Sequence, residues 1–357
     1  MSKEIYVLHE RETKEHFIAL EQLAFDESFE VKFREYLVFR FLLKSILKLD
    51  FSLLDKQLRN VVFLISCLIT RDKTIVLGVA PLDFRLIVLK FILRNHRVYY
   101  FTSWSDWDGD FFPHRNLVGL YWVKKAWKIF LEKELSGLIC VTDSALKNLT
   151  KNYVISCKKQ VVYHSMNVDV DLSFKKKIEQ KLHVVIVGRL EDSKGIKEIF
   201  EIIDLVDPSQ FMFTFVGNGS LKKFVQNKSE EYSNVRFLGF LSRPELFSLY
   251  ADSHIQLLIS KKIGGWEELF GMVIIEAMSK GVPTIATNHI GPRQIIEDGK
   301  TGYLLEETYD IADKAAEILN TVSWNDLMNM QKVLLSSAKQ YESKLISEKW
   351  KEVLRNG

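Results

Sequence analysis

The sequence predicts an α/β protein made of two doubly wound domains, each with a parallel β-sheet covered by helices on both faces. Three observations lead to this fold class. The chain has 357 residues, which is enough for two domains. Short apolar runs rich in β-branched and aromatic residues alternate with helical patterns along most of the chain. A polar, Lys-rich stretch over 169–181 separates the two halves as a linker.

Ten apolar runs are the expected strands, and none shows the polar alternation of a strand with one face in water. In the first half they are Ile5–Leu8, Thr74–Val79, Arg97–Phe101, Leu138–Val141 and Gln160–Tyr163. In the second half they are His183–Val187, Phe211–Val216, Val235–Leu238, Ile255–Ile259 and Thr284–Ala286. We therefore expect one domain over 1–168, a second over 182–335, and a helix within 336–357 that returns to the first domain.

Composition excludes several classes of protein. No apolar run approaches the roughly 18 residues of a membrane span. The first residues read as a strand and lack the core of a signal peptide. Cys67, Cys140 and Cys157 are odd in number and lack metal-ligand spacing, so we expect reduced packing residues in a cytoplasmic protein.

Charge is distributed unevenly, although the net charge is only +3. Residues 1–165 contain 25 Lys and Arg against 19 Asp and Glu, whereas 166–357 contain 24 against 27. A basic first half indicates an anionic partner, either a membrane surface or nucleic acid. No nucleic-acid-binding motif is present, so we expect no nucleic-acid partner.

The most informative segment runs from Glu268 to Pro283. The helix expected from Met272 ends at Gly281, so Glu268 lies on a loop before that helix and Glu276 lies within it. The backbone N–H groups expected to face the same space belong to Phe270, Gly271 and Met272. Carboxylates that grip sugar hydroxyls beside amides that bind an anion suit a sugar attached to a phosphate. By itself, such a pair of glutamates is more often a solvated charge pair.

A second basic motif opens the second domain. The expected strand runs into Gly188, and a loop with Arg189 and Lys194 follows before a helix that starts near Gly195. A planar guanidinium and a point charge at a helix N-terminus suit a diphosphate, although two solvated surface charges are an equal alternative.

Glycines follow the next two expected strands at Gly217 and Gly239. The turn at Gly217 lacks the third glycine of a dinucleotide fingerprint, so alone it is a weak nucleotide signal. The backbone from Gly239 to Leu241 could face a flat base, and we expect Phe240 itself to pack in the core.

Taken in order, these motifs resemble the C-terminal domain of retaining glycosyltransferase family 4, the glycosyl transferases group 1. The motifs that carry the resemblance are Gly188–Gly195, Val216–Gly219, Phe237–Gly239, Glu268–Pro283 and Gly291–Gly302. The resemblance is strong over 183–306 and extends weakly to Val162–Asp169, where Asn167–Asp169 resembles an interdomain turn. It implies the GT-B fold, with two Rossmann-like domains facing each other across a cleft.

The resemblance also implies a donor and roles for named residues. The donor would be a nucleotide-diphosphate sugar with a UDP or GDP carrier, with no further cofactor and no metal. Arg189 and Lys194 would hold the diphosphate, and Glu268 would act on the donor sugar, so these three are the catalytic residues. The donor-binding residues would be Gly188, Gly217, Gly239, Phe270, Gly271, Met272 and Glu276, with Glu276 on the ribose. Family members usually carry Glu where this chain has Gln294.

The N-terminal half departs from the family pattern. The loop after the first strand, Leu8–Glu10, contains no glycine, and no His follows the strand in the middle of the domain. That strand instead leads to Asp106, Asp108 and Asp110. The context of a metal-binding aspartate pair or of a calcium loop is missing. We therefore expect a polar loop in which Asp106 and Asp108 lie on the acceptor side.

Two stretches have the chemistry of a helix at a membrane surface. Phe33–Leu49 is very apolar and carries Arg40, Lys44 and Lys48 at every fourth position, and Leu120–Phe130 mixes aromatic and basic residues. Core packing with solvated lysines explains both stretches equally well.

The expected function is a retaining glycosyltransferase that extends a lipid-linked glycan for a bacterial capsule or lipopolysaccharide. We expect it in the cytoplasm, peripheral at the inner face of an anionic membrane. Two other functions remain open from the sequence: a catalytically silent glycosyltransferase-like partner subunit, and a GT-B sugar-nucleotide epimerase. The motifs do not identify the sugar, the base, the acceptor or the linkage.

Overall fold

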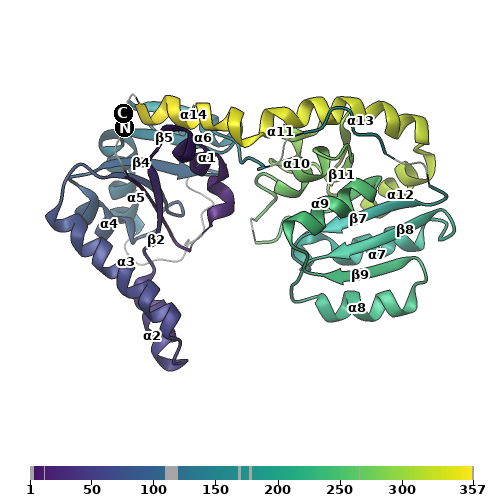
Figure 1. The fold of residues 1–357 in the computed structure, drawn as a ribbon, viewed down its shortest axis with the longest axis horizontal. Helices are drawn as coiled ribbons and strands as arrows, with labels where there is room; N and C mark the ends of the chain where they lie inside the picture. The colour runs from purple at the N-terminus through teal and green to yellow at the C-terminus, as the bar shows by residue number, and fades with distance from the viewer. Residues whose placement is uncertain are drawn as a thin grey trace. The chain divides into compact units, whose positions relative to one another are not determined.

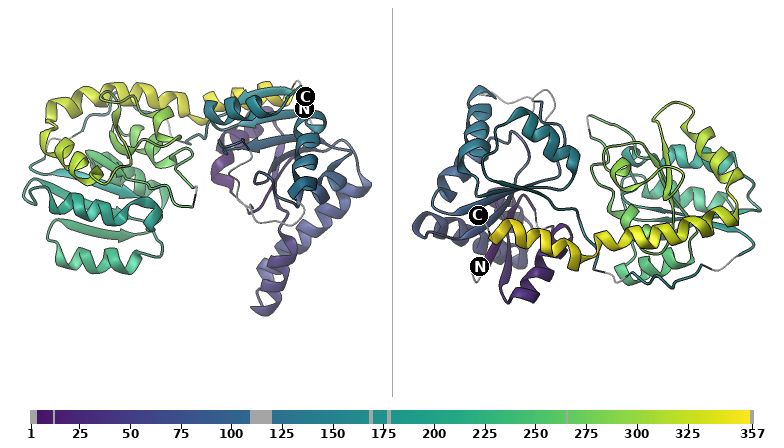
Figure 2. Two further views of the ribbon diagram at one scale, coloured as in Figure 1. Left: turned by 180° about the vertical axis from the view of Figure 1, so that it is seen from behind. Right: turned by 90° about the horizontal axis from the view of Figure 1, so that it is seen from above.

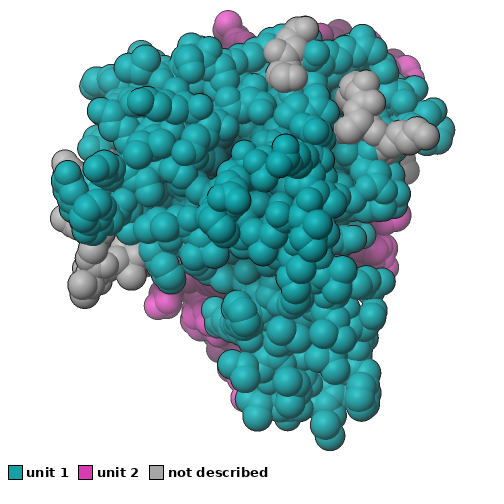
Figure 3. Space-filling model, turned by 90° about the vertical axis from the view of Figure 1, so that its left-hand side faces the viewer, with its two compact units in different colours: residues 1–167, 343–357 teal, residues 168–342 magenta. Residues whose placement is uncertain are grey.

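The computed structural model describes residues 4–11, 13–108, 120–167, 170–176, 179–264 and 266–355. Of the predicted features, Asp110 and Val168–Asp169 lie outside these residues. Contacts divide the chain into two units, coloured separately in Figure 3. Unit 1 comprises Met1–Asn167 and Ser343–Gly357, and unit 2 comprises Val168–Glu342. Each unit is described by itself.

Unit 1 contains a six-stranded parallel sheet with the order β2-β1-β3-β4-β5-β6 (Figure 1). Its strands are β1 Glu4–His9, β2 Glu30–Glu35, β3 Thr74–Gly78, β4 Arg97–Thr102, β5 Gly137–Cys140 and β6 Lys158–Val161. Its helices are α1 Ile18–Glu27, α2 Val38–Leu47, α3 Phe51–Ile69, α4 Leu86–Leu93, α5 Leu120–Ile129, α6 Asp143–Asn152 and α14 Ser343–Arg355. Right-handed crossovers in this strand order place α1 on one face and α3, α4 and α5 on the other.

The last helix of the structure, α14, belongs to unit 1. Helix α14 packs against α1 and against strands β5 and β6, although more than 170 residues of unit 2 separate it from the rest of unit 1. Trp350 of α14 is buried, and its ring stacks on Phe101 with the ring centroids 5.9 Å apart. The two further views in Figure 2 show α14 lying along unit 1.

Unit 2 contains a second six-stranded parallel sheet with the order β12-β11-β10-β7-β8-β9. Its strands are β7 Leu182–Val187, β8 Phe211–Val216, β9 Val235–Gly239, β10 Ile255–Leu258, β11 Thr284–Thr287 and β12 Gly302–Leu305. Its helices are α7 Ile196–Asp204, α8 Lys222–Glu231, α9 Arg243–Asp252, α10 Met272–Met278, α11 Pro292–Ile295, α12 Ile311–Thr321 and α13 Trp324–Ala338. The order reverses between β7 and β10, which is the topological switch point of a doubly wound sheet.

The structure corrects the sequence prediction at one edge of each sheet. The helix expected over Phe33–Leu49 begins only at Val38, because its first residues belong to strand β2. Strand β2 alternates charged and apolar residues along an edge, so it shows no continuous apolar run. The short edge strand β12 was also missed.

The membrane-like stretch on α5 divides by face. Trp127 and Phe130 are buried in the core between the sheet and its helices, whereas Tyr121 and Trp122 are exposed. Lys124, Lys125 and Lys128 are also exposed. Among the described residues, no helix combines the length and the apolarity needed to cross a bilayer.

Candidate functional site

The candidate site lies at the carboxyl ends of β7 and β10, where ligands bind in doubly wound folds. The loops that follow these strands pack directly on each other. The N–H of Lys261 donates to the carbonyl of Ser193 at 2.9 Å. At Gly195, where φ is 63°, an added Cβ would lie 1.8 Å from the carbonyl oxygen of Ile259. Only glycine therefore allows the loop before α7 to approach the loop after β10 so closely.

Lys194 and Glu268 form the centre of this site. Lys194 ends the short turn before α7, and its ammonium forms an ion pair with the Glu268 carboxylate. Both side chains are largely buried, at 14% and 13% exposure. The Ser260 hydroxyl lies 3.4 Å from the same carboxylate oxygen. The structure thus joins two sequence-predicted residues that are 74 positions apart, and each would be left as an uncompensated charge without the other.

The Trp266 ring lies beside both predicted cations. The Lys194 ammonium is 4.8 Å from the ring centroid and the Arg189 guanidinium is 5.9 Å from it. Arg189 also pairs with Glu191 at 2.9 Å, and its side chain is 58% exposed. The site therefore contains one cation fixed by a largely buried ion pair and a second that is open to solvent and can turn toward an anionic ligand.

His289 fixes the backbone of Glu268, and the sequence analysis missed it. Its Nδ1 accepts a hydrogen bond from the Glu268 N–H at 3.2 Å, so its Nε2 carries the proton and donates to Glu307 at 3.0 Å. The Gly291 N–H also donates to the Glu268 carbonyl at 2.9 Å. His289 follows β11 at the carboxyl edge of the sheet, and that position was the signal available in the sequence.

Three predicted glycines line the same edge of the sheet. Gly188, Gly217 and Gly239 follow or end the neighbouring strands β7, β8 and β9. The Gly217 N–H donates to the Gly239 carbonyl at 2.8 Å, and a Cβ on Gly217 would lie 1.8 Å from the Gly188 carbonyl oxygen. A Cβ on Gly188 would meet no atom within 4 Å, so Gly188 faces open space.

Phe240 does not pack in the core, contrary to the sequence prediction. Its side chain is 84% exposed. The chain leaves the edge strand β9 through Gly239 at a φ of 70°, which carries the next residue beyond the sheet. An exposed aromatic ring therefore lies at the same carboxyl edge as the three glycines.

The predicted helix after Glu268 is present as α10, which begins after Gly271 at a φ of 90°. The N–H groups at the start of an α-helix have no partner within the helix, and in α10 the first of these belongs to Met272. The Phe270 side chain is buried, so it is not available to a ligand. Glu276 lies inside α10 at 8% exposure. Burial, with a smaller effect from the Glu276 carboxylate, raises the pKa of the Tyr250 hydroxyl well above its ordinary value.

Unit 1 has a pocket of about 380 Å³ at the carboxyl ends of β1, β3 and β4. It is lined by His9, Glu10, His16, Tyr36, Gly78, Val79, Ala80, Pro81, Phe101, Thr102, Ser103 and Trp104. The His9 ring occupies the space where a Cβ on Gly78 would stand, 2.1 Å from the ring. Asp106 and Asp108 follow Trp104 on the same loop but do not belong to this lining. Their assignment to the acceptor side stays a prediction, and the histidines are polar groups that sequence reasoning missed.

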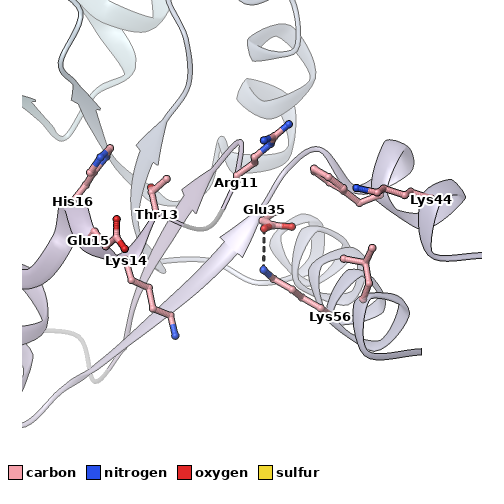
Figure 4. A pocket seen from close by; sticks show the side chains of 10 residues that line it. Arg11, Thr13, Lys14, Glu15, His16, Glu35, Lys44 and Lys56 are labelled. Carbon is pink, nitrogen blue, oxygen red and sulfur yellow. Dashed lines mark hydrogen bonds and ion pairs between the residues drawn. The ribbon is translucent and has the colours of Figure 1, made fainter. Parts of the chain in front are cut away.

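A second pocket of unit 1, of about 600 Å³, is rich in basic residues (Figure 4). It is lined by Arg11, Thr13, Lys14, Glu15, His16, Glu35, Phe41, Lys44, Leu53 and Lys56. Within it, Lys56 pairs with Glu35 at 3.0 Å. The chemistry of the lining suits an anionic group.

The histidines of unit 1 should make the protein sensitive to acid. Burial lowers the pKa of His9 to about 4, and it also lowers the pKa values of His16 and His164 below 6.5. Below pH about 6.5 the unfolded chain therefore binds protons that the folded chain does not, and stability falls as the pH falls. Each unmatched proton changes the free energy of unfolding by about 1.4 kcal/mol per pH unit. Urea unfolding from pH about 7 to about 5 measures this slope. His16→Gln should reduce it, and a flat wild-type profile would contradict the prediction.

The segment that contains the site is similar to a known protein family. Residues 169–334 match the family model described as glycosyl transferases group 1. A 41.2 kDa protein from the cps region of Klebsiella pneumoniae is 28% identical over 223 residues, covering 57% of this chain and 58% of that protein. The poly(ribitol-phosphate) alpha-N-acetylglucosaminyltransferase of Staphylococcus aureus is 26% identical over 249 residues, covering 66% of this chain and 48% of that enzyme. The chain spans about half the length of such curated relatives.

Solved structures match over a larger share of the chain. HepE of Anabaena in complex with UDP has a TM-score of 0.67 at 15% identity, covering 99% of this chain and 100% of HepE. The lipopolysaccharide outer core galactosyltransferase WaaB has a TM-score of 0.63 at 15% identity, with 99% of each chain covered. The two parallel six-stranded sheets and these neighbours establish the GT-B fold that the sequence predicted.

Proposed function

We propose that the protein is a retaining glycosyltransferase. It moves a sugar from a nucleotide-diphosphate sugar to a hydroxyl of a lipid-linked glycan in the synthesis of a bacterial surface polysaccharide. The observation that carries this proposal is the largely buried Lys194–Glu268 ion pair at the switch point of unit 2. The pair lies within the segment that matches glycosyl transferases group 1.

The donor would lie along the carboxyl edge of the unit 2 sheet. Arg189 and Lys194 would bind its diphosphate, since both cations flank one aromatic ring and one of them is exposed. Glu276 would accept the hydroxyls of the ribose, and the amides at the start of α10 would assist near the sugar. The similar HepE structure is a complex with UDP, and this neighbour supports a UDP-linked donor for the present chain.

The chemistry follows from these positions. The bond between the anomeric carbon and the diphosphate oxygen breaks, which leaves positive charge on the sugar and negative charge on the leaving group. Arg189 and Lys194 would stabilise the leaving diphosphate. The Glu268 carboxylate would orient the sugar and stabilise the positive charge that develops on it. The acceptor oxygen bonds to the same face of the anomeric carbon, and its proton passes to the leaving phosphate oxygen.

The acceptor assignment has support from unit 1 and from the relatives. The first half of the chain carries more Lys and Arg than Asp and Glu, which suits an acceptor linked to a lipid through phosphate. Among the similar proteins, one comes from a cps region, one transfers N-acetylglucosamine to poly(ribitol-phosphate), and one acts on the lipopolysaccharide outer core.

The anomeric configuration of the product tests the proposed reaction. A donor with an α-linked sugar should give an α-glycoside, because bond breaking and bond making occur on the same face. The coupling constant of the anomeric proton, read by NMR on the purified product, decides the configuration. A β-linked product from an α-linked donor would overturn the retaining assignment, and free sugar-nucleotide isomerisation without an acceptor would indicate an epimerase instead.

A further inference from the structure

We propose that unit 1 docks on an anionic lipid bilayer through the outer sides of α2, α3 and α4. The residues of this apolar face are Phe39, Leu43, Ile46, Leu47, Leu49, Phe51, Leu58, Val62, Ile65, Ile69, Phe84, Ile87, Val88 and Phe91. The bilayer is the partner to which the proposal commits. The surface lies on a different unit from the donor site, so the proposal stands or falls independently of sugar transfer.

The apolar face consists of helical stripes. On α3, Leu58, Val62, Ile65 and Ile69 recur at the spacing of one helix side, and they are 50%, 65%, 51% and 80% exposed. The segment from Phe84 to Phe91 repeats this spacing at and before α4. Helix α3 packs against both α2 and α4, so the stripes belong to one surface. This arrangement resembles the apolar side of an interfacial helix.

Helices α3 and α4 have a second side that already forms part of the core. Phe63 and Cys67 of α3 and Leu89 of α4 are buried against the sheet. Between the core part of α3 and its projecting end, Gln57 donates to the Glu35 carboxylate at 2.8 Å, and Asn60 accepts from the Glu35 N–H at 3.3 Å. The helices are therefore anchored, and their exposed stripes are additional apolar surface.

Exposed apolar side chains are concentrated in this region. Among the described residues, 15 of the 27 exposed large apolar side chains fall between Phe39 and Phe91. Contiguous apolar patches on soluble monomers are normally limited to a few hundred Å², and larger ones mark protein or membrane interaction sites. Some apolar partner must therefore cover this region, and charge and shape decide which one.

The charge around the apolar face favours anionic lipid. Residues 36–49 contain Arg40, Lys44 and Lys48 and no acidic residue, and 84–97 likewise contain only basic charges. The neighbouring α5 adds exposed Lys124, Lys125 and Lys128 beside Tyr121 and Trp122. A second copy of the chain facing the same surface would bring these cations together, which disfavours a symmetric dimer. Basic residues around an apolar surface with exposed aromatic rings match an anionic membrane interface.

Shape supports the same partner. Helix α2 projects beyond the rest of unit 1 in Figure 1. Phe39 and Leu47 on this projection are 84% and 82% exposed. A convex apolar projection can enter the boundary between headgroups and acyl chains without a matching groove. The basic pocket of Figure 4, with Lys44 of α2 in its lining, lies at the root of the projection, where phosphate headgroups would be.

Vesicle sedimentation tests the proposal with the full chain. The probes are vesicles of phosphatidylcholine alone and vesicles that also contain phosphatidylglycerol. The protein should sediment with the anionic vesicles and release as salt rises, because such attraction acts over a Debye length of about 10 Å at 0.1 M. A triple variant, Phe39→Gln, Leu47→Gln and Val62→Gln, removes apolar surface without changing charge. Its partition coefficient should fall by at least about tenfold, because three apolar side chains that would be buried in the bilayer are replaced by polar ones.

Two further variants separate the contributions. Leu205→Gln removes an exposed apolar side chain from unit 2 and should sediment like the wild type. Replacing Lys124, Lys125 and Lys128 by Glu should abolish the salt-dependent part of the binding. The triple variant should keep the wild-type melting temperature and its nucleotide-induced thermal shift, which shows that folding and the donor site are intact.

Three results would overturn the proposal. The first is equal sedimentation of the triple variant and the wild type. The second is absence of binding to anionic vesicles at low salt. The third is a dimer in light scattering that the triple variant converts to a monomer while vesicle binding is absent, which would assign the apolar face to a second copy. A wild-type protein that binds vesicles but transfers no sugar would instead contradict the proposed function. That result would leave the proposed docking surface unaffected.

Discussion

Replacing Lys194 with alanine should lower kcat/KM for sugar transfer by more than about 100-fold, as loss of a charge that stabilises a leaving group commonly does. The ammonium pairs with Glu268 in a largely buried site, at 14% and 13% exposure. Its removal would take a cation from the diphosphate and also leave the Glu268 carboxylate without its partner. Steady-state rates measured over a range of donor concentrations give kcat/KM and test this loss.

Arg189→Ala should show a loss of similar size, since its guanidinium is the second cation beside the Trp266 ring. The matched control is Lys197→Ala. Lys197 lies one turn further along, on α7, is 59% exposed and pairs with Asp192. Exposed pairs contribute little, so this variant should keep wild-type rates. Near wild-type turnover in both Lys194→Ala and Arg189→Ala would remove these residues from the diphosphate site.

Replacing Glu268 with glutamine should lower kcat by about 100-fold or more, because the neutral amide no longer stabilises the positive charge that develops on the sugar. The substitution keeps the side chain's size and its capacity to accept hydrogen bonds from Lys194 and Ser260. The loss should therefore appear mainly in kcat, with a smaller change in the KM for the donor. The melting temperature of the variant should be lower than that of the wild type, because the largely buried Lys194 ammonium loses its ion-pair partner, so both rates are compared well below the lower melting temperature.

The control for charge removal is Glu297→Gln. Glu297 is 64% exposed and forms an ion pair with the exposed Lys300 at 3.1 Å, so its loss should not change the rate. Mass spectrometry of wild-type enzyme trapped during turnover addresses the mechanism. A sugar covalently attached to Glu268 would show a double displacement through that carboxylate and would contradict the front-face reaction.

The residues that the sequence selected for the donor site are brought together within one unit, but their contacts were not readable from the sequence. Arg189, Lys194 and Glu268 stood out because charged residues follow apolar strands in a recognisable order. Their meeting depends on the strand order, which places β10 next to β7 and so joins two loops more than 60 residues apart. His289 was missed for the same reason, since its role depends on which backbone its ring contacts.

Exposure was the property that the sequence predicted least well. Trp122 and Trp127 both belong to α5, yet the first is exposed and the second is buried in the core. Phe240 was expected in the core and is exposed, because strand β9 lies at an edge. The apolar stripe on α3 could equally have packed inside. An apolar pattern shows that one side of a helix is more stable when it is buried against other apolar groups. The neighbouring elements of the fold determine whether those groups belong to the same protein.

The sequence alone therefore determined the fold class, the positions of most strands and the residue types of the donor site. These follow from local patterns: continuous apolar runs for buried parallel strands, and glycines with charged residues at strand ends. The tertiary structure decided the Lys194–Glu268 ion pair, the support of Glu268 by His289 and the exposed apolar face of α2, α3 and α4. The physical reason is that pairing and burial are relations between distant segments, and the order of the strands in each sheet sets those relations.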